Sequence, residues 1–384
     1  MGKILIVSPK DISSRDFEGS QARIFEIAKF LSKKNSVDLV CLSRNEFDNK
    51  ISFLNKIKKF KINFFLRIIN TIIFSINLSP MQNGFFYSKK MKDFISDNKD
   101  DYDTIICHLL RCAQYLPKDF EGKKILEMTD FTSTNYEQAI SQMSFLNPLK
   151  YIYFIENFFV KKYERKILKY FDEIVLISDK EISDVTKITE RKKVSVIGHS
   201  CNPNKNIFVH NSLNYKISFI GNINYLPNKI ACYKFSRKIL PVINKEYPNV
   251  KFNIIGKINY LDKLILSFFS NVVVCGPIKN PEKELKKSIC GMCNVNIATG
   301  LQSKIFYYMS YGLPVITSKS SYPKRVFKKN KEILVYKNDA DLVNLIFSLI
   351  KNKKISNRIS NNGFNTLKKK YKLSNIYRKY EKII

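Results

Sequence analysis

A lysine in the first turn of an expected helix is the residue of this sequence best placed for chemistry. The stretch Ile297 to Ser318, IATGLQSKIFYYMSYGLPVITS, predicts a strand end, a tight loop at Gly300 and a helix from about Ser303. Lys304 then faces the positive end of the helix dipole, which is unfavourable unless an anion binds there. With Ser303 as N-cap, the loop N–H groups and the ammonium would hold that anion together. The alternative is an ordinary strand–loop–helix with a solvated lysine.

The charge balance also favours an anionic partner. The 384 residues include 66 Lys and Arg against 33 Asp and Glu, which gives a formal net charge of +33. Such a charge attracts nucleic acid, an anionic membrane surface or a diphosphate-bearing substrate. Lys, Asn and Ile abound throughout, as in chains from AT-rich genomes, so the charge permits these partners without selecting one. No recognised nucleic-acid-binding motif accompanies the charge, and we therefore predict no specific nucleic-acid partner.

The cysteines and the N-terminus indicate a cytoplasmic protein. Eight cysteines stand singly in or beside apolar runs, which is typical of reduced thiols. Cys290 and Cys293 form one CxxC pair, without a second pair and with only three histidines in the chain, so we predict a structural turn into a strand over Cys293–Ala298. We expect no metal and no cofactor. The N-terminal MGKILIVSPK is shorter than a signal peptide.

The segment Phe60–Leu78, FKINFFLRIINTIIFSINL, is apolar but interrupted by polar residues. On a helix its polar side chains share one face and its apolar side chains share another. The polar face holds Asn63, Arg67, Asn70, Thr71 and Ser75, and the apolar face holds Phe64, Ile68, Ile72 and Ile76. This pattern argues against a membrane-spanning helix. An interfacial helix with cationic flanks and an amphipathic helix packed on its own domain both remain open.

Strand and helix patterns alternate along the whole chain. In the first half, strands are expected at Lys3–Val7, Val37–Leu42, Thr104–Cys107, Lys124–Met128, Glu173–Ile177 and Val194–Ile197. In the second half, strands are expected at Ile217–Ile220, Lys251–Ile255, Val272–Cys275, Cys293–Ala298 and Pro314–Thr317, with helices between them, one of them at Glu282–Ser288. Two such runs predict an α/β fold of two Rossmann-like, doubly wound parallel-sheet domains.

A change of composition marks the expected domain boundary. Residues 201–214 lose periodicity and collect Asn and Pro, so we expect a linker there. The expected first domain covers 1–200 and the second 215–365. A basic helical tail, 366–384, is expected to cross back to the first domain.

Residues at the strand ends form a candidate site, because ligands of such sheets bind beyond the carboxyl ends of the strands. The first sheet would present Gly19, Ser20, His108 and Asp130, and the second Gly221, Gly256, Gly276 and the Gly300–Lys304 loop. Glycines allow close approach of the backbone, and helix N-termini favour a diphosphate. A cleft between the two sheets would suit a nucleotide-linked ligand.

Three segments of the chain resemble one family in the correct order. These are ISFIGNINYLPNKIACYKFSRKILPVINKEYPNVKFNIIG, GLQSKIFYYMSYGLPVI and FVKKYERKILKYFDEIVLISDKE. They resemble segments of the retaining GT-B glycosyltransferases of family 4, also called group 1. The first is similar to the start of the family's donor domain in its Pro-Asn variant, and the second to the donor loop and helix written G-[IL]-Q-[NS]-K. The third is similar to the connector helix and the strand that follows it.

The resemblance implies transfer of a sugar from a nucleotide-sugar to an acceptor hydroxyl, with retention at the anomeric carbon and no bound metal. The donor diphosphate would meet Gly19, Ser20 and the loop with its lysine, which comprises Gly300, Leu301, Gln302, Ser303 and Lys304. Asp130 stands where the family usually has a histidine near the donor sugar. His108 matches a frequent histidine on the acceptor side.

The chain departs from the family at several donor positions. The paired glutamates of the family fall on Thr299 and Tyr307, and the second of them normally binds the nucleotide ribose. The usual arginine and lysine fall on Asn222 and Asn228, and the Asn-Gly of the interdomain loop is His199-Ser200. Tyr307 and Tyr308 could instead be core aromatics at helical spacing.

These observations predict a peripheral glycosyltransferase at the cytoplasmic face of a membrane. Its acceptor would be a lipid-linked or other glycan in surface polysaccharide, lipopolysaccharide or glycolipid assembly, and an anionic membrane surface would be a partner. The alternatives are a catalytically weak homologue that binds a nucleotide-sugar or a partner subunit, a nucleic-acid-binding protein, and a GT-B nucleotide-sugar epimerase.

Overall fold

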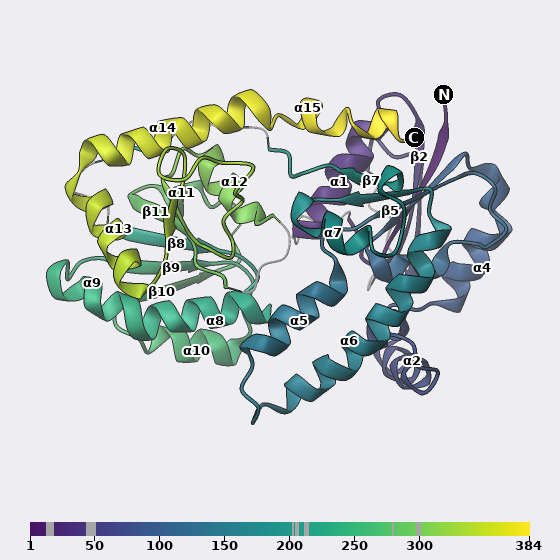
Figure 1. Ribbon diagram of the computed structural model, residues 1–384, viewed down its shortest axis with the longest axis horizontal. Helices are drawn as coiled ribbons and strands as arrows, with labels where there is room; N and C mark the ends of the chain where they lie inside the picture. The colour runs from purple at the N-terminus through teal and green to yellow at the C-terminus, as the bar shows by residue number, and fades with distance from the viewer. Residues whose placement is uncertain are drawn as a thin grey trace. The chain divides into compact units, whose positions relative to one another are not determined.

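The chain folds around two parallel β-sheets, each in its own compact unit (Figure 1). The computed structural model describes all residues except 13–18, 44–50, 202, 204–206, 211–214, 279 and 297–300. The first unit comprises Met1–Gly198 together with Ile376–Ile384, and the second comprises His199–Asn375. The expected fold class, two parallel-sheet α/β domains, is confirmed.

The first sheet has seven strands in the order β3-β2-β1-β4-β5-β6-β7. They are β1 Lys3–Ser8, β2 Ser36–Ser43, β3 Lys56–Lys61, β4 Thr104–His108, β5 Lys123–Glu127, β6 Glu173–Leu176 and β7 Val194–Val196. In central β1, Ile6 pairs with Leu39 on one side and Ile106 on the other. The strand is an apolar run because helices cover both faces of such a sheet. Strand β3, KIKKFK, was not expected from the sequence, because lysines at a sheet edge obscure the apolar pattern.

Helices connect these strands. They are α1 Gly19–Leu31, α2 Phe64–Ile76, α3 Met81–Phe85, α4 Lys89–Asp97, α5 Thr132–Gln142, α6 Pro148–Ile167 and α7 Ile182–Val185. The core of the unit gathers buried side chains of β1, β4, β5 and β6 with those of α4 and α6. The expected amphipathic segment is therefore a helix from Phe64 onward, and its first residues belong to β3.

The end of the chain packs on the first unit. Helix α15, Leu373–Tyr377, spans the boundary between the units, and Tyr377 lies with its ring centroid 6.1 Å from that of Phe30 in α1. The Lys379 ammonium donates to the Val196 carbonyl oxygen at 3.1 Å. Tyr380 is fully buried there, so the terminal residues are part of the fold of the first unit.

The second sheet has six strands in the order β10-β9-β8-β11-β12-β13. They are β8 Lys216–Ile220, β9 Lys251–Ile255, β10 Val272–Gly276, β11 Ser288–Cys293, β12 Val315–Ser318 and β13 Leu334–Tyr336. The strand expected at Cys293–Ala298 was placed too late, and the CxxC pair lies inside β11. The chain turns at Lys287, where φ is 64°, and pairing with β8 begins at Ser288. The helix expected to reach Ser288 therefore ends earlier, as α11 Glu282–Leu285.

The helices of this unit cover the sheet. They are α8 Leu226–Lys234, α9 Leu240–Glu246, α10 Tyr260–Ser267, α11, α12 Ser303–Ser310, α13 Asp339–Lys351 and α14 Lys353–Lys370. A π-helical turn, Phe235–Ile239, joins α8 to α9 directly before Pro241. A π-turn accommodates a proline, which cannot donate the usual helical hydrogen bond.

Candidate functional site

Lys304 is a buried cation in the first turn of α12. Lys304 is 7% exposed, and its Nζ donates a hydrogen bond to Asn228 Oδ1 at 2.7 Å. Nζ also lies 4.1 Å from the centroid of the Phe219 ring. Within the described part of the chain, Lys304 forms no ion pair with a carboxylate. Burial lowers the pKa of Lys304 because it desolvates the ammonium, and no carboxylate among the described residues offsets that cost.

The Asn228 side chain is held with its oxygen toward this ammonium. Its Nδ2 donates to the Asn222 carbonyl oxygen at 2.9 Å, which leaves Oδ1 for Lys304. The Asn222 side chain in turn accepts from the Asn224 N–H at 3.1 Å. Both asparagines expected at the donor site therefore belong to one hydrogen-bonded turn next to Lys304.

Gly221 lies beside this cluster and leaves room in front of the ammonium. A Cβ at Gly221 would lie 2.9 Å from Asn228 Nδ2 and 3.5 Å from Lys304 Nζ. At Gly256 φ is +133°, and a Cβ there would lie 2.0 Å from the Gly221 carbonyl oxygen. A side chain at either glycine would thus disturb the approach of a ligand or of the two loops.

The start of α12 lacks a side-chain cap. The N-cap residue is Gln302, whose side chain makes no capping hydrogen bond, and Ser303 is the first residue of the helix. The expectation that Ser303 caps the helix was therefore wrong by one position. The His199 ring nitrogen Nε2 lies 2.9 Å from the Leu301 carbonyl oxygen just before the helix. An uncapped helix start suits an anion. Thr299 and Gly300, also expected at this site, lie outside the described residues.

The two tyrosines of α12 have different environments. Tyr308 is fully buried, accepts from the Ile220 N–H at 2.6 Å and donates to the Met292 carbonyl oxygen at 3.3 Å. A Cβ at Gly291 would lie 2.2 Å from its ring, so that position in β11 has room for glycine alone. Tyr307 is half-buried, and its ring centroid lies 5.3 Å from that of Tyr311. Tyr308 is a core residue, and the ribose role of Tyr307 stays a prediction.

In the first unit, His108 at the end of β4 belongs to a buried charged cluster. Its Nδ1 lies 2.6 Å from Glu127 Oε2, and Arg23 Nε donates to Glu127 Oε1 at 2.5 Å. The Arg23 guanidinium also donates to the carbonyl oxygens of Ile197 and Gly198, at 2.7 and 2.9 Å. Burial alone would raise the pKa of Glu127, but Arg23 and His108 outweigh it and lower that pKa to about 2.

The ionised Glu127 carboxylate determines which ring nitrogen of His108 carries the proton. A carboxylate accepts hydrogen bonds, so the proton lies on Nδ1. In a neutral imidazole Nε2 then carries the lone pair, and this atom is buried with no hydrogen-bond partner among the described residues. His108 is therefore oriented as an acceptor, by a glutamate and an arginine that sequence reasoning missed. A glutamate inside the apolar strand KKILE was the available signal.

Asp130 lies three residues beyond β5, and its carboxyl group acts electrostatically on the carboxyl group of Glu181. Asn135 Nδ2 donates to Asp130 Oδ2 at 3.4 Å, and the Phe131 N–H donates to Glu181 Oε1 at 3.1 Å. Burial, and then the neighbouring Asp130 carboxylate, raise the pKa of Glu181 to about 8. Near pH 7 Glu181 is therefore mostly protonated. Glu181 is the last residue of the connector segment quoted above, but sequence reasoning did not single it out.

Gly19 and Ser20 were expected in a loop, but they are the first two residues of α1. Gly19 is exposed and Ser20 is half-buried. The helix they open carries Arg23 one turn later, so the candidate anion-binding turn and the buried cluster share one element. Across the described residues, no group of three or more His, Cys, Asp or Glu side chains could hold a metal ion.

Comparison with known proteins identifies the class. Residues 214–352, within the second unit apart from its ends, match the family model described as glycosyl transferases group 1. No match was found among curated protein sequences. The group 1 resemblance expected from the sequence is confirmed by the family match, while the Pro-Asn subgroup stays a prediction.

Solved structures share the fold over the full chain. Anabaena HepE in complex with UDP and glucose is 12% identical, with 100% of this chain and 99% of that chain covered and a TM-score of 0.68. Sucrose-phosphate synthase from Thermosynechococcus elongatus is 11% identical, with 100% and 98% covered and a TM-score of 0.72. A variant of S. aureus TarM in complex with fondaparinux, alpha-GlcNAc-glycerol and UDP is 12% identical, with 100% and 99% covered and a TM-score of 0.69.

The two-sheet architecture is the GT-B fold, and it carries a group 1 glycosyltransferase domain as its second unit. The chain thus contains a group 1 glycosyltransferase domain, at residues 214–352, within a GT-B fold.

Proposed function

We propose that the chain transfers a sugar from a nucleotide-sugar donor to an acceptor hydroxyl, with retention at the anomeric carbon and without a bound metal. The observation that carries this proposal is Lys304, a buried ammonium whose described polar partner is the neutral Asn228 amide. A buried charge without a counter-ion is costly, so the site favours an anionic ligand. HepE, which shares the fold, binds UDP and glucose, which supports a nucleotide-sugar as that ligand.

The chemistry asks the enzyme to stabilise two opposite charges. A nucleoside diphosphate leaves with negative charge, which Lys304 and the uncapped N–H groups of α12 would stabilise. The sugar becomes cationic as the bond breaks, which Asp130 would stabilise, with Glu181 protonated beside it. His108, with Nε2 as acceptor, would receive the proton of the acceptor hydroxyl.

The acceptor in this proposal is a lipid-linked or other glycan, in surface polysaccharide, lipopolysaccharide or glycolipid assembly. A structure of the lipopolysaccharide outer core galactosyltransferase WaaB matches the fold, with 12% identity, 99% and 98% covered and a TM-score of 0.59. We place the protein at the cytoplasmic face of a membrane as a peripheral protein. The apolar side chains exposed along α2 support this placement. In the described chain, no helix has the length and apolar character needed to cross a membrane.

A second candidate function is a catalytically weak homologue that binds a nucleotide-sugar or serves as a partner subunit. It is favoured by Thr299 and Tyr307, which stand where the family has paired glutamates. A nucleotide-sugar panel separates the two functions, because UDP-, GDP- and ADP-sugars can each be tested for thermal stabilisation and for hydrolysis or transfer. Stabilisation with turnover supports the transferase, and stabilisation without turnover supports the binding protein. The absence of both stabilisation and turnover would contradict both functions.

A further inference from the structure

Helix α2 packs against the protein with its polar face and turns its apolar face outward. No residue of α2 is buried. The apolar residues on its outer face are 42–74% exposed, namely Phe64, Phe65, Leu66, Ile68, Ile69, Ile72, Ile73 and Ile76. A helix of a protein in water normally has the opposite orientation. Of the two possibilities left open by the sequence, packing on its own domain therefore occurs through the polar face, and an interfacial helix stays a prediction.

Specific contacts fix this orientation. Arg67 lies over the Phe85 and Phe86 rings, at 5.1 and 5.7 Å from their centroids, and Asn70 Nδ2 donates to the Tyr87 carbonyl oxygen at 3.3 Å. A Cβ at Gly84 would lie 2.4 Å from the Asn70 carbonyl oxygen, so α2 and α3 approach closely. The outward apolar face is thus built into the fold, and something other than water must cover it.

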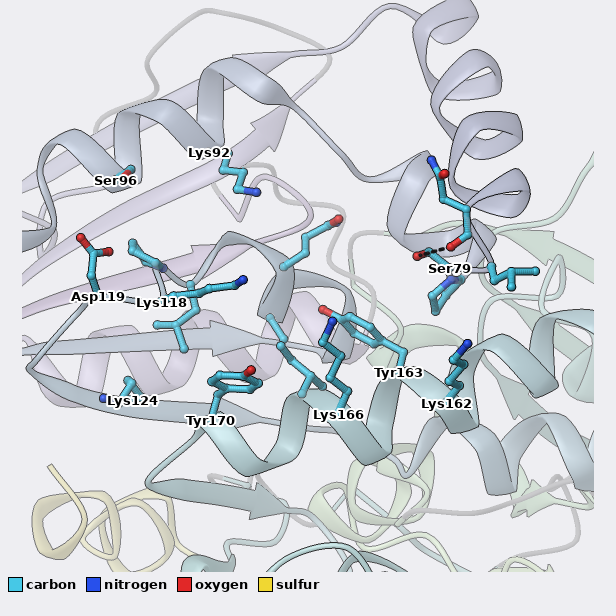
Figure 2. Close-up of a pocket in the computed structure, with 18 residues that line it drawn as sticks. Ser79, Lys92, Ser96, Lys118, Asp119, Lys124, Lys162, Tyr163, Lys166 and Tyr170 are labelled. Carbon is cyan, nitrogen blue, oxygen red and sulfur yellow. Dashed lines mark hydrogen bonds between the residues drawn. The ribbon is translucent and has the colours of Figure 1, made fainter.

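A cavity of about 670 Å³ lies at the C-terminal end of α2 (Figure 2). Apolar side chains form much of its wall, among them Leu78, Pro80, Leu116 and Ile167. Leu78 directly extends the exposed apolar surface of α2, since it is itself 55% exposed. Along the chain, the apolar wall of the cavity therefore begins two residues beyond Ile76, the last exposed apolar residue of α2.

Lysines surround the cavity. They come from α4, from α6, from the segment before β5 and from β5 itself, and they are Lys92, Lys118, Lys124, Lys162 and Lys166 (Figure 2). The one acidic side chain of the lining, Asp119, is paired with Lys99. In the part of the chain that the structure describes, no carboxylate pairs with Lys92, Lys118, Lys162 or Lys166. A ligand that fits this cavity carries negative charge on an apolar body.

We propose that this cavity binds the phosphate headgroup of an anionic membrane lipid while the apolar face of α2 lies among the neighbouring acyl chains. A free phosphate would leave the apolar wall and α2 uncovered. A second copy of this chain would bring another net charge of +33 to a lysine-rich surface, so repulsion opposes a dimer there. A lipid surface satisfies both the charge and the apolar area.

The inference deepens the membrane placement in the proposed function and rests on that part alone. The cavity is separate from the residues placed in catalysis, because Lys124 stands at the start of β5 whereas Asp130 follows the end of that strand. Donor binding should therefore be independent of the cavity.

The test is sedimentation of the full chain with vesicles of phosphatidylcholine, alone or mixed with phosphatidylglycerol. We expect binding to the mixed vesicles and a loss of at least about tenfold in affinity for Lys162→Glu/Lys166→Glu, since each basic residue near an anionic surface contributes roughly 1 kcal/mol. The matched control is Lys354→Glu/Arg358→Glu, an exposed i, i+4 pair on α14 that changes the net charge equally. The control should bind nearly as the native chain does.

A second variant tests the helix. Ile72→Ser/Ile76→Ser alters exposed residues, so it should keep the native unfolding temperature while losing affinity for mixed vesicles. Equal loss in the lysine pair and its control, or no loss in the lysine pair, overturns the headgroup site. Stabilisation by glycerol phosphate that needs Lys162 and Lys166, without vesicle binding, overturns the lipid as ligand.

The same experiment separates this inference from the wider proposal. If the native chain does not bind mixed vesicles but is stabilised by nucleoside diphosphates, the membrane placement and the lipid site in the cavity are both contradicted. The transferase proposal is then unaffected. A chain that binds the vesicles through Lys162 and Lys166 but binds no nucleotide contradicts the donor site alone.

Discussion

Lys304 and Asn228 meet in the second unit, where the lysine Nζ donates to the asparagine Oδ1 at 2.7 Å. The two residues are 76 positions apart in the chain, and their hydrogen bond joins α12 to α8. The amide orients the ammonium but does not neutralise it. The pair therefore holds a positive charge ready for an anion, which is the property that the proposed donor site needs.

Asn228→Asp should convert this site into a closed ion pair. The carboxylate would neutralise Lys304 and repel a diphosphate, so affinity for UDP or GDP should fall on the order of tenfold, for a charged hydrogen bond of about 1.5–3 kcal/mol. The unfolding temperature should stay the same or rise, because a buried cation gains a counter-ion. Titration calorimetry with both diphosphates measures the effect, and unchanged affinity would show that the ligand does not contact Lys304.

The two tyrosines of α12 should respond differently to loss of the hydroxyl. Tyr308→Phe leaves the Ile220 N–H without its partner, so the free energy of unfolding should fall by about 1–3 kcal/mol with little change in nucleotide affinity. Tyr307→Phe should lower nucleotide affinity several-fold with little change in stability, if Tyr307 takes the ribose position. Denaturant unfolding and calorimetry on both variants separate these effects. A loss of stability alone at Tyr307 would assign it to the core.

Arg23 should be essential for the stability of the first unit. Arg23→Ala leaves the buried Glu127 carboxylate without its arginine and with His108 as its remaining partner, so the free energy of unfolding should fall by roughly 3–5 kcal/mol. Arg23→Lys keeps the charge but loses the contacts to Ile197 and Gly198. Its free energy of unfolding should therefore lie between those of the native chain and the alanine variant. Denaturant unfolding of the three proteins is the measurement. Equal stability of all three would mean that the cluster contributes nothing.

Glu181 should make stability depend on pH in a defined direction. Its pKa of about 8 in the folded chain lies above the ordinary 4.5, so the native state binds more protons than the unfolded state between these values. The contribution is complete below about pH 4.5 and is lost as the pH rises toward 8. Glu164 acts in the same direction, because burial raises its pKa to about 7. It accepts a hydrogen bond from the Ser133 N–H at 3.2 Å.

Glu181→Gln should flatten this dependence, because glutamine has no proton to lose. Unfolding free energies of the native chain and the variant, measured from about pH 5 to pH 8, give the comparison. The pKa of Glu127 is lowered, so this residue changes stability only below its ordinary pKa of 4.5 and not between about pH 5 and pH 8. Parallel pH profiles would show that Glu181 is not protonated in the folded chain.

The sequence predicted what is encoded locally. Buried strands such as β1 and β9 are short apolar runs, and the start of α12 follows from the loop before it. Strand β3 was not predicted because it lies at a sheet edge, where the exposed Lys56, Lys58 and Lys61 interrupt the apolar pattern. Strand β11 was misplaced because an apolar run does not reveal where pairing with β8 begins.

The parts of the site that escaped prediction depend on contacts between distant residues. Arg23 meets Glu127 across 104 positions, and Glu181 meets the Phe131 N–H across 50. A lone glutamate in a sequence does not show whether it will be ionised in a cluster or protonated beside an aspartate. The reversed packing of α2 was equally hidden, because a helical pattern gives two faces but does not say which one the protein covers.

The most direct test compares the affinity of the native chain and of Lys304→Met for UDP and GDP by titration calorimetry. Methionine keeps the packing against Phe219 and removes the charge. The matched control is Lys229→Met, whose ammonium is already paired with Asp262 at 2.5 Å. The account predicts a loss of affinity of about tenfold or more for Lys304→Met and little loss for the control. Equal affinity of the native chain and Lys304→Met would contradict it.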